Sequence, residues 1–160
     1  MLKNFLLFVL FYLVLNPAKS QISSSLSYSL TYLTSQYDVF HSISHTLTKN
    51  RLVLNQEISL GHKYLVVGEF NWRICNQVGV IIPCSPRLNV ELGGAIGFIS
   101  QWRNLNFYQL QEDIYFTMRV KSLYSFFLRN SFGLVQQFKG NNQLLTLPNL
   151  TIQAGISYDI

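Results

Sequence analysis

Charged residues are scarce in this chain, where they make up 12% of the sequence against 49% hydrophobic residues. Beyond the first twenty residues no apolar run is long enough for a transmembrane helix, and no segment keeps a helical period. These absences argue against an α-helical membrane protein. The low charge is also unusual for a water-soluble domain and needs another explanation.

Cysteine and histidine are rare as well. The chain has two cysteines, Cys75 and Cys84, and three histidines, none of them at zinc-finger spacing from the cysteines. We therefore predict no metal site and no cofactor. In an exported chain, two cysteines this close together predict a disulfide across the loop between them.

The first twenty residues have the pattern of a secretory signal peptide. Lys3 supplies a positive charge, Leu2 to Leu15 form an apolar stretch, and Ala18-Lys19-Ser20 is a small-x-small cleavage pattern. We predict a cleaved signal peptide over residues 1–20 and a single mature domain over residues 21–160.

Basic residues are too few and too scattered for a nucleic-acid-binding protein. Loss of Lys3 and Lys19 with the signal peptide leaves 12 − 2 = 10 Lys and Arg against seven Asp and Glu, a net charge of about +3. No basic run or basic stripe interleaved with aromatic residues is present. We expect no nucleic-acid partner, whereas an acidic membrane surface remains compatible with this charge.

A period of two dominates the rest of the sequence. Successive side chains of a β-strand point to opposite faces, so this alternation predicts strands with one oily and one polar side. Eight such segments are present, at residues 22–34, 36–48, 51–60, 63–74, 87–99, 109–121, 122–136 and 149–160.

The polar faces of these segments collect the charges. Ten charged residues lie there: Asp38, Glu57, Glu69, Arg73, Glu91, Asp113, Arg119, Lys121, Arg129 and Asp159. Glu112 is the only strand charge on an oily face. A soluble β-sandwich would show the same alternation with its oily faces turned inward, so alternation alone does not separate it from a membrane barrel.

Three features favour the membrane barrel. Strands of about ten to fourteen residues are long for soluble domains and suit tilted membrane-spanning strands. Aromatic residues lie near strand ends, which is typical of interface girdles: Tyr32, Tyr37, Tyr64, Trp72, Phe98, Trp102, Tyr108, Tyr124 and Tyr158. An even strand number permits closure without unpaired edges. We predict an all-β, single up-and-down antiparallel transmembrane β-barrel of about eight strands, with the secreted soluble sandwich as the alternative.

The inward charges should meet in the lumen, because an eight-stranded barrel is just wide enough for side chains to fill. The expected network contains Glu57, Glu69, Arg73, Glu91, Arg119 and Arg129. Buried charges must be paired, so we interpret this set as a polar plug that blocks the bore. An ion-conducting path is the alternative.

The connections alternate between the two ends of such a barrel. With both termini in the periplasm, the outward loops are expected around Ser35 and at residues 61–62, 100–108 and 138–148. The periplasmic turns are expected at residues 49–50, 75–86 and 121–122. If the loop between the cysteines lay on the other side, a strand would have been miscounted.

The last strand carries a pattern that resembles a known family. The segment from Leu150 to Ile160 resembles the C-terminal assembly signal of bacterial outer-membrane β-barrels, in which hydrophobic residues alternate back from the C-terminus. Ile156 and Tyr158 fit that pattern, and Ile160 replaces the usual Phe. The resemblance implies recognition by the barrel assembly machinery and insertion into the lipid of the outer membrane. The mature start at Gln21 after Ala-x-Ser is similar to that of exported Bacteroidetes-type proteins.

His41 and His45 interrupt the oily face of residues 36–48. Lipid A deacylases of this architecture use an outward His and Ser, but here Ser42 and Ser44 point to the opposite face and no Arg precedes the His. We therefore predict no catalytic residue. The expected function is that of a non-enzymatic structural, adhesive or accessory envelope component with possible envelope protein partners. A barrel subunit of a conjugal-transfer or secretion apparatus and a lipid-modifying outer-membrane enzyme are the alternatives.

Overall fold

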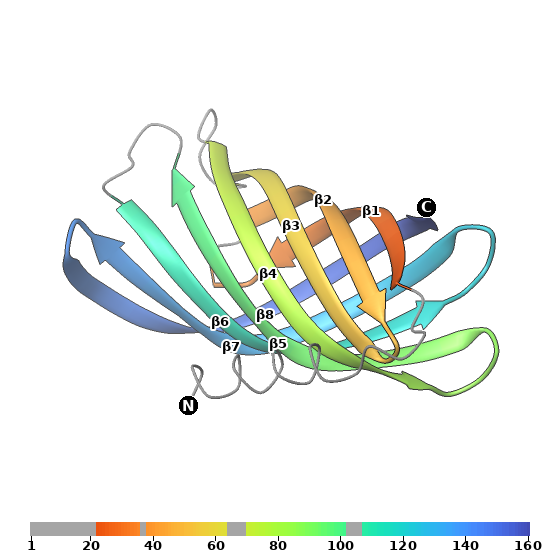
Figure 1. Ribbon diagram of the computed structural model, residues 1–160. Coiled ribbons are helices and arrows are strands. Elements are labelled where there is room, and N and C mark those ends of the chain that lie inside the picture. Colours follow the sequence, from red (N-terminus) through yellow and green to blue (C-terminus); the bar gives the residue numbers. More distant parts are fainter. Residues whose placement is uncertain (1–21, 36–37, 64–69, 102–106) are drawn as a thin grey trace.

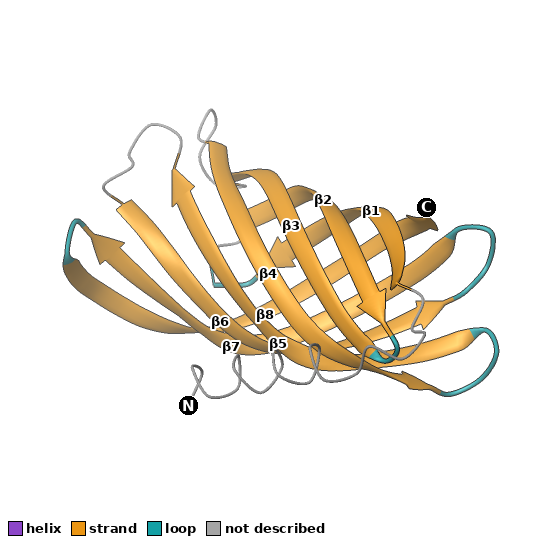
Figure 2. Ribbon diagram, in the orientation of Figure 1, coloured by secondary structure: helices purple, strands orange, loops and turns teal. Residues whose placement is uncertain are grey.

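The chain folds into one closed β-barrel in the computed structural model, which describes residues 22–35, 38–63, 70–101 and 107–160. Eight strands follow one another in chain order: β1 (Ile22–Leu33), β2 (Asp38–Lys49), β3 (Leu52–Lys63), β4 (Phe70–Pro83), β5 (Leu88–Gln101), β6 (Phe107–Val120), β7 (Ser125–Lys139) and β8 (Asn142–Asp159). Each pairs antiparallel with the next, and β8 closes the ring on β1 (Figures 1 and 2). Within these ranges no helix is long and apolar enough to cross a membrane.

The closed ring confirms the predicted fold class and excludes the two-sheet sandwich. Three predicted boundaries are wrong. β4 begins at Phe70 and runs on to Pro83, because Gln77 and Val78 continue the alternation that we interpreted as ending at the first cysteine. β8 begins at Asn142, so most of the expected 138–148 loop is strand, and residues 61–62 belong to β3.

The two ends of the barrel differ in their connections. At one end, here called the turn end, β1 begins and β8 ends, and the connections after β2, β4 and β6 lie there too. At the other end, here called the loop end, β1, β3, β5 and β7 end. The turn after β7 contains Gly140, whose φ of 58° favours glycine. Figure 1 shows the C-terminus at the same end of the barrel as the turns after β4 and β6. The short turn at residues 84–87 thus lies on the side of the termini, as expected.

The barrel is inverted relative to a soluble protein. Buried side chains that line the lumen are mostly polar, such as Glu57 with 0% and Gln111 with 0% exposure. Large apolar side chains point outward and are exposed, such as Ile58 at 64% and Ile114 at 70%. Because the side chains of a strand alternate between its two faces, this arrangement follows directly from the period of two in the sequence.

Aromatic side chains gather toward both ends of the outer wall. Near the loop end, four aromatic rings form a row along the wall: Trp72, Phe98, Tyr108 and Phe138. The centroids of neighbouring rings in this row lie 5.3, 5.5 and 5.0 Å apart. Near the turn end the Tyr124 and Tyr158 rings lie 5.8 Å apart. The predicted girdle residues Tyr37, Tyr64 and Trp102 lie outside the described residues.

Candidate functional site in the barrel lumen

The centre of the lumen contains a buried ion pair between neighbouring strands. Glu57 of β3 accepts a hydrogen bond from the guanidinium of Arg73 of β4, and the two side chains are 0% and 3% exposed. Glu57 also accepts a bond from the Ser59 hydroxyl at 2.9 Å and one from the Gln153 amide of β8 at 2.7 Å. This carboxylate therefore ties one side of the barrel to β8 near the closure of the ring.

The Arg73 guanidinium links this pair to a second cluster on β6. Arg73 Nε donates to the side-chain oxygen of Gln111 at 3.0 Å, and Gln111 donates in turn to Asp113 at 2.5 Å. The Asp113 carboxylate also accepts bonds from Ser131 at 2.6 Å and Asn149 at 3.3 Å. The inward Asp113 carboxylate is thus held by amide and hydroxyl groups from three strands.

Arg129 of β7 crosses the lumen closer to the turn end. Its guanidinium donates to Thr117 at 2.7 Å, to Gln77 of β4, and to Glu91 of β5 at 3.4 Å. The same group lies over the Tyr115 ring, 4.6 Å from its centroid, in a cation–π contact. The Tyr115 hydroxyl donates to Glu91 at 2.6 Å, which completes the surroundings of that carboxylate.

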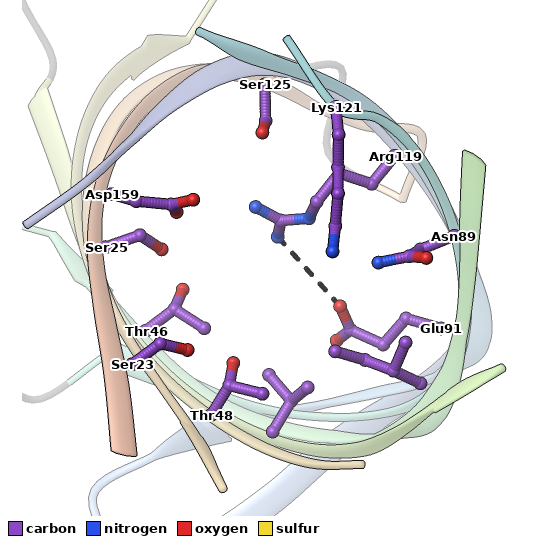
Figure 3. Close-up of a pocket in the computed structure, with 12 residues that line it drawn as sticks. Ser23, Ser25, Thr46, Thr48, Asn89, Glu91, Arg119, Lys121, Ser125 and Asp159 are labelled. Atoms are coloured by element: carbon purple, nitrogen blue, oxygen red, sulfur yellow. Dashed lines mark ion pairs between the residues drawn. The ribbon is translucent and has the colours of Figure 1, made fainter. Parts of the chain in front are cut away.

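The turn-end mouth of the lumen is a small polar vestibule of about 90 Å³. Figure 3 shows Glu91 and Arg119 at its wall, with an N···O distance of 4.0 Å between them, and Lys121 and Asp159 reaching in from the rim. Arg119 also donates to Ser157 at 2.7 Å. The vestibule has room for several water molecules.

Five of the six residues expected in the lumen network lie there, and the structure brings them together as two ion-paired groups, which Gln153 joins by bonds to Glu57 and Arg129. Glu57 pairs with Arg73, while Glu91 lies between Arg129 and Arg119. The sixth, Glu69, lies outside the described residues. Sequence reasoning missed the neutral partners that join the charges, chiefly Gln77, Gln111, Tyr115 and Gln153. Alternation places each of them inward, but only the tilt of the strands decides which of them meet.

The predicted disulfide is wrong. Both cysteines are free thiols: Cys75 is buried in the middle of β4, and Cys84 is exposed in the turn that follows. They stand 84 − 75 = 9 positions apart on extended chain, a span of about 30 Å, far beyond the reach of an S–S bond. Cys75 packs inside with Ala95 and Tyr115. Within the described ranges, no group of three His, Cys, Asp or Glu residues could hold a metal ion.

The two outward histidines of β2 each have a hydroxyl partner from β1. Tyr28 Oη lies 2.7 Å from His41 Nδ1, and Ser24 Oγ lies 2.7 Å from His45 Nε2. Ser42 and Ser44 face the lumen, as expected. The sequence did not predict the pair between Ser24 and His45, because the two residues lie on different strands. The backbone N–H groups around it belong to the strand ladders, so within the described strands nothing orients His45 from behind or stabilises an oxyanion.

The residues of the expected assembly signal lie on the outer face of β8. Ile156 and Tyr158 are exposed on the wall, and Ile160 follows at the chain end, where its backbone N–H bonds to Ser24. The row therefore presents apolar side chains outward beside the strand β1 that closes the ring.

No known family matches the sequence, and a search of curated proteins found no match. Solved structures do match. The N-terminal β-barrel domain of Pseudomonas aeruginosa OprF aligns with a TM-score of 0.54 at 10% identity, over 89% of this chain and 100% of that chain. A structure from the de novo design of transmembrane β-barrels aligns with 0.54 at 11% identity, over 86% and 95%. The solution structure of the designed protein TMB2.3 aligns with 0.53 at 12%, over 89% and 98%.

The fold is that of eight-stranded transmembrane barrels. At these identities the likeness concerns the path of the backbone and not an activity.

Proposed function

We propose that this chain is a non-enzymatic outer-membrane β-barrel with a closed lumen, which serves as a structural, adhesive or accessory component of a bacterial envelope. The observation that carries the proposal is the inverted distribution of side chains, with an apolar wall around a charged and hydrogen-bonded interior. In water such a wall would expose far more apolar surface than a soluble monomer normally does. In lipid the same wall is favourable.

The dimensions of the wall support a membrane position. The strands have 12 to 18 residues, and a strand tilted by about 45° needs only about 9–11 residues to cross the hydrocarbon core. Closure of β8 on β1 leaves no unpaired edge, which lipid could not solvate. The aromatic row from Trp72 to Phe138 and the pair of Tyr124 and Tyr158 then mark the two interfaces.

The lumen network supports a plug and not an open pore. Arg129 reaches from β7 to Gln77 on β4, and Gln153 reaches from β8 to Glu57 on β3, so side chains bridge the lumen at two levels. A buried donor or acceptor left without its partner costs about 1–3 kcal/mol, and more where a charged group is involved, so such contacts open rarely. The function then lies in the surface that the barrel presents and not in transport.

The remaining parts of the proposal concern export and orientation. Residues 1–20 act as the signal peptide, and Ile156, Tyr158 and Ile160 serve as the signal for the barrel assembly machinery. The turn end with both termini faces the periplasm, and the loop end faces outward, where envelope protein partners would bind. Removal of Tyr158 and Ile160 by Ala substitution should lower the amount of assembled barrel without changing its lumen.

Reconstitution of the mature chain into liposomes tests the proposal directly. The folded barrel should float with the vesicles and migrate differently on gels before and after boiling, and the vesicles should remain tight to small ions. A chain that stays in solution without detergent would overturn the membrane position. Vesicles that leak ions steadily in its presence would overturn the closed lumen.

A further inference from the structure

Among the described residues, the outer wall carries one acidic side chain in the middle of a strand. Glu112 of β6 is exposed between Leu110 and Ile114, and within the described residues it has no hydrogen-bond or ion-pair partner. A charged group on the lipid face of a barrel is costly, most of all near the bilayer centre. A partner outside the barrel wall would offset that cost.

The opposite side of the wall offers the complementary group. His41 of β2 is exposed, and its Nδ1 is already bonded to the Tyr28 hydroxyl at 2.7 Å. Its Nε2 has no partner among the described residues and is left as the ring nitrogen that can donate to an acceptor outside the wall. A carboxylate is a strong acceptor for such a donor.

These two groups cannot meet within one barrel. β2 and β6 are four strands apart in a ring of eight, so His41 and Glu112 stand on opposite sides of the same copy. They can meet only when the β2 side of one copy faces the β6 side of another.

The two groups stand at nearly the same depth. The register connects His45 on β2 through Gln56, Asn76 and Ile96 to Glu112 on β6. The row begins at Leu26 on β1 and continues past Glu112 to Pro148 on β8. Leu33, near the loop end of β1, pairs with Thr151 of β8, and Pro148 lies three residues further toward the loop end. The row therefore rises toward the loop end as it passes around the barrel.

Four steps between strands tilted by about 40° place Glu112 about 12 Å closer to the loop end than His45. His41 lies four residues from His45 along β2, which places it about 10 Å closer to the loop end than His45. The depths of His41 and Glu112 therefore agree within a few ångströms, as two copies inserted in the same orientation require.

A hollow and a protrusion accompany the two polar groups. On the turn-end side of Glu112, Gly94 of β5 forms the floor of an outer groove of about 460 Å³ whose walls include Val78, Ile114 and Phe132. On the turn-end side of His41, Ile43 and its register partner Ile58 of β3 are each 64% exposed. When the walls of two copies face each other, the strand order of one is the mirror image of the other. If β2 of one copy faces β6 of the other, β3 of the first therefore faces β5 of the second. Ile58 then lies opposite the hollow at Gly94.

We propose that the β2 side of this barrel binds the β6 side of a second copy in the membrane, with His41 donating to Glu112 and Ile58 packing into the hollow at Gly94. The contact is head-to-tail. Because the two faces are on opposite sides of one barrel, repeated contacts form rows of barrels in the membrane plane and not a closed dimer. This inference rests on the membrane position proposed above.

Cross-linking in liposomes tests the geometry. In a background with Cys75→Ser and Cys84→Ser, one tagged copy carries Ile58→Cys and a differently tagged copy carries Gly94→Cys. A Cβ at Gly94 meets nothing closer than a backbone oxygen of Asp113 at 3.8 Å, so this variant should fold. The mixed copies should cross-link under oxidation. Asn130→Cys, exposed on the other side of β6, is the matched control and should not cross-link to Ile58→Cys.

Energy transfer between labelled barrels tests the chemistry. Glu112→Gln and His41→Gln should each weaken association by about 5- to 30-fold, the effect of one or two kcal/mol for a hydrogen-bonded pair in lipid. The exchange of both residues, His41→Glu with Glu112→His, should restore it. A heat-modifiable band confirms folding of every variant.

The outcomes separate this inference from the proposed function. A chain that does not float with liposomes overturns both. Inserted barrels that stay monomeric, that cross-link equally at Asn130, or that associate unchanged in the Glu112→Gln variant overturn the pairing and leave the membrane position intact.

Discussion

Replacement of Glu57 by Gln tests whether the lumen network holds the barrel together. The change keeps the size and shape of the side chain and removes its charge. Arg73, which is 3% exposed, would keep its bond to Gln111 at 3.0 Å but would lose the carboxylate that neutralises it. We expect a loss of about 3–5 kcal/mol in the free energy of unfolding, the usual cost of leaving one charge of a buried pair alone.

The double variant Glu57→Gln with Arg73→Met separates pairing from mere packing. Removal of both charges leaves neither member of the pair as an unpaired ion, and such replacements are often close to neutral. We therefore expect the double variant to be more stable than Glu57→Gln alone. Glu112→Gln, measured at a low ratio of protein to lipid at which barrels do not associate, is the matched control, because it makes the same chemical change on the outer wall, outside the lumen network.

Urea unfolding in vesicles, followed by the gel shift of the intact barrel, measures these differences. A loss of less than about 1 kcal/mol for Glu57→Gln, the range of exposed ion pairs, would show that the buried pair does not stabilise the barrel. A double variant as unstable as the sum of the two single variants would show that the two charges act independently.

Three further outcomes follow from the structure. Gly133→Ala should lower the free energy of unfolding by about 1–3 kcal/mol, because its Cβ would collide with the backbone of β6, whereas Gly94→Ala should fold normally. The amount of heat-modifiable barrel distinguishes the two variants. A maleimide should label Cys84 in the intact barrel and Cys75 only after unfolding, which mass spectrometry of the labelled peptides checks; equal labelling of both in the folded state would contradict the buried position of Cys75. Arg129→Ala should raise the ion leak of liposomes above that of the unsubstituted barrel, because it removes the side chain that bridges β7 to β4, and unchanged tightness would show that other residues close the lumen.

The alternation of side chains, together with the length of the strands, their even number and the position of the aromatic residues, was enough to predict the barrel from sequence. One oily and one polar face on strands of this length leave few solutions in which the oily faces are covered and no edge is open. The inward positions of Glu57, Arg73 and Arg129 follow from the same period, because a side chain at a given position has only two directions to choose from.

The partners of those side chains required the tertiary structure. Which inward residues meet depends on strand tilt and register, and these place Gln153 of β8 against Glu57 and Gln77 of β4 against Arg129. The pair of Ser24 and His45 joins two strands for the same reason.

The cysteines show the limit of local reasoning most clearly. Their closeness in sequence suggested a loop, but the alternation continues through Cys75 to Pro83, and an extended chain separates the two thiols. The sequence by itself determined which way each side chain points, because that depends only on its place along a strand. The tertiary structure decided what each side chain meets, because contacts across the lumen and across the wall join residues far apart in the chain.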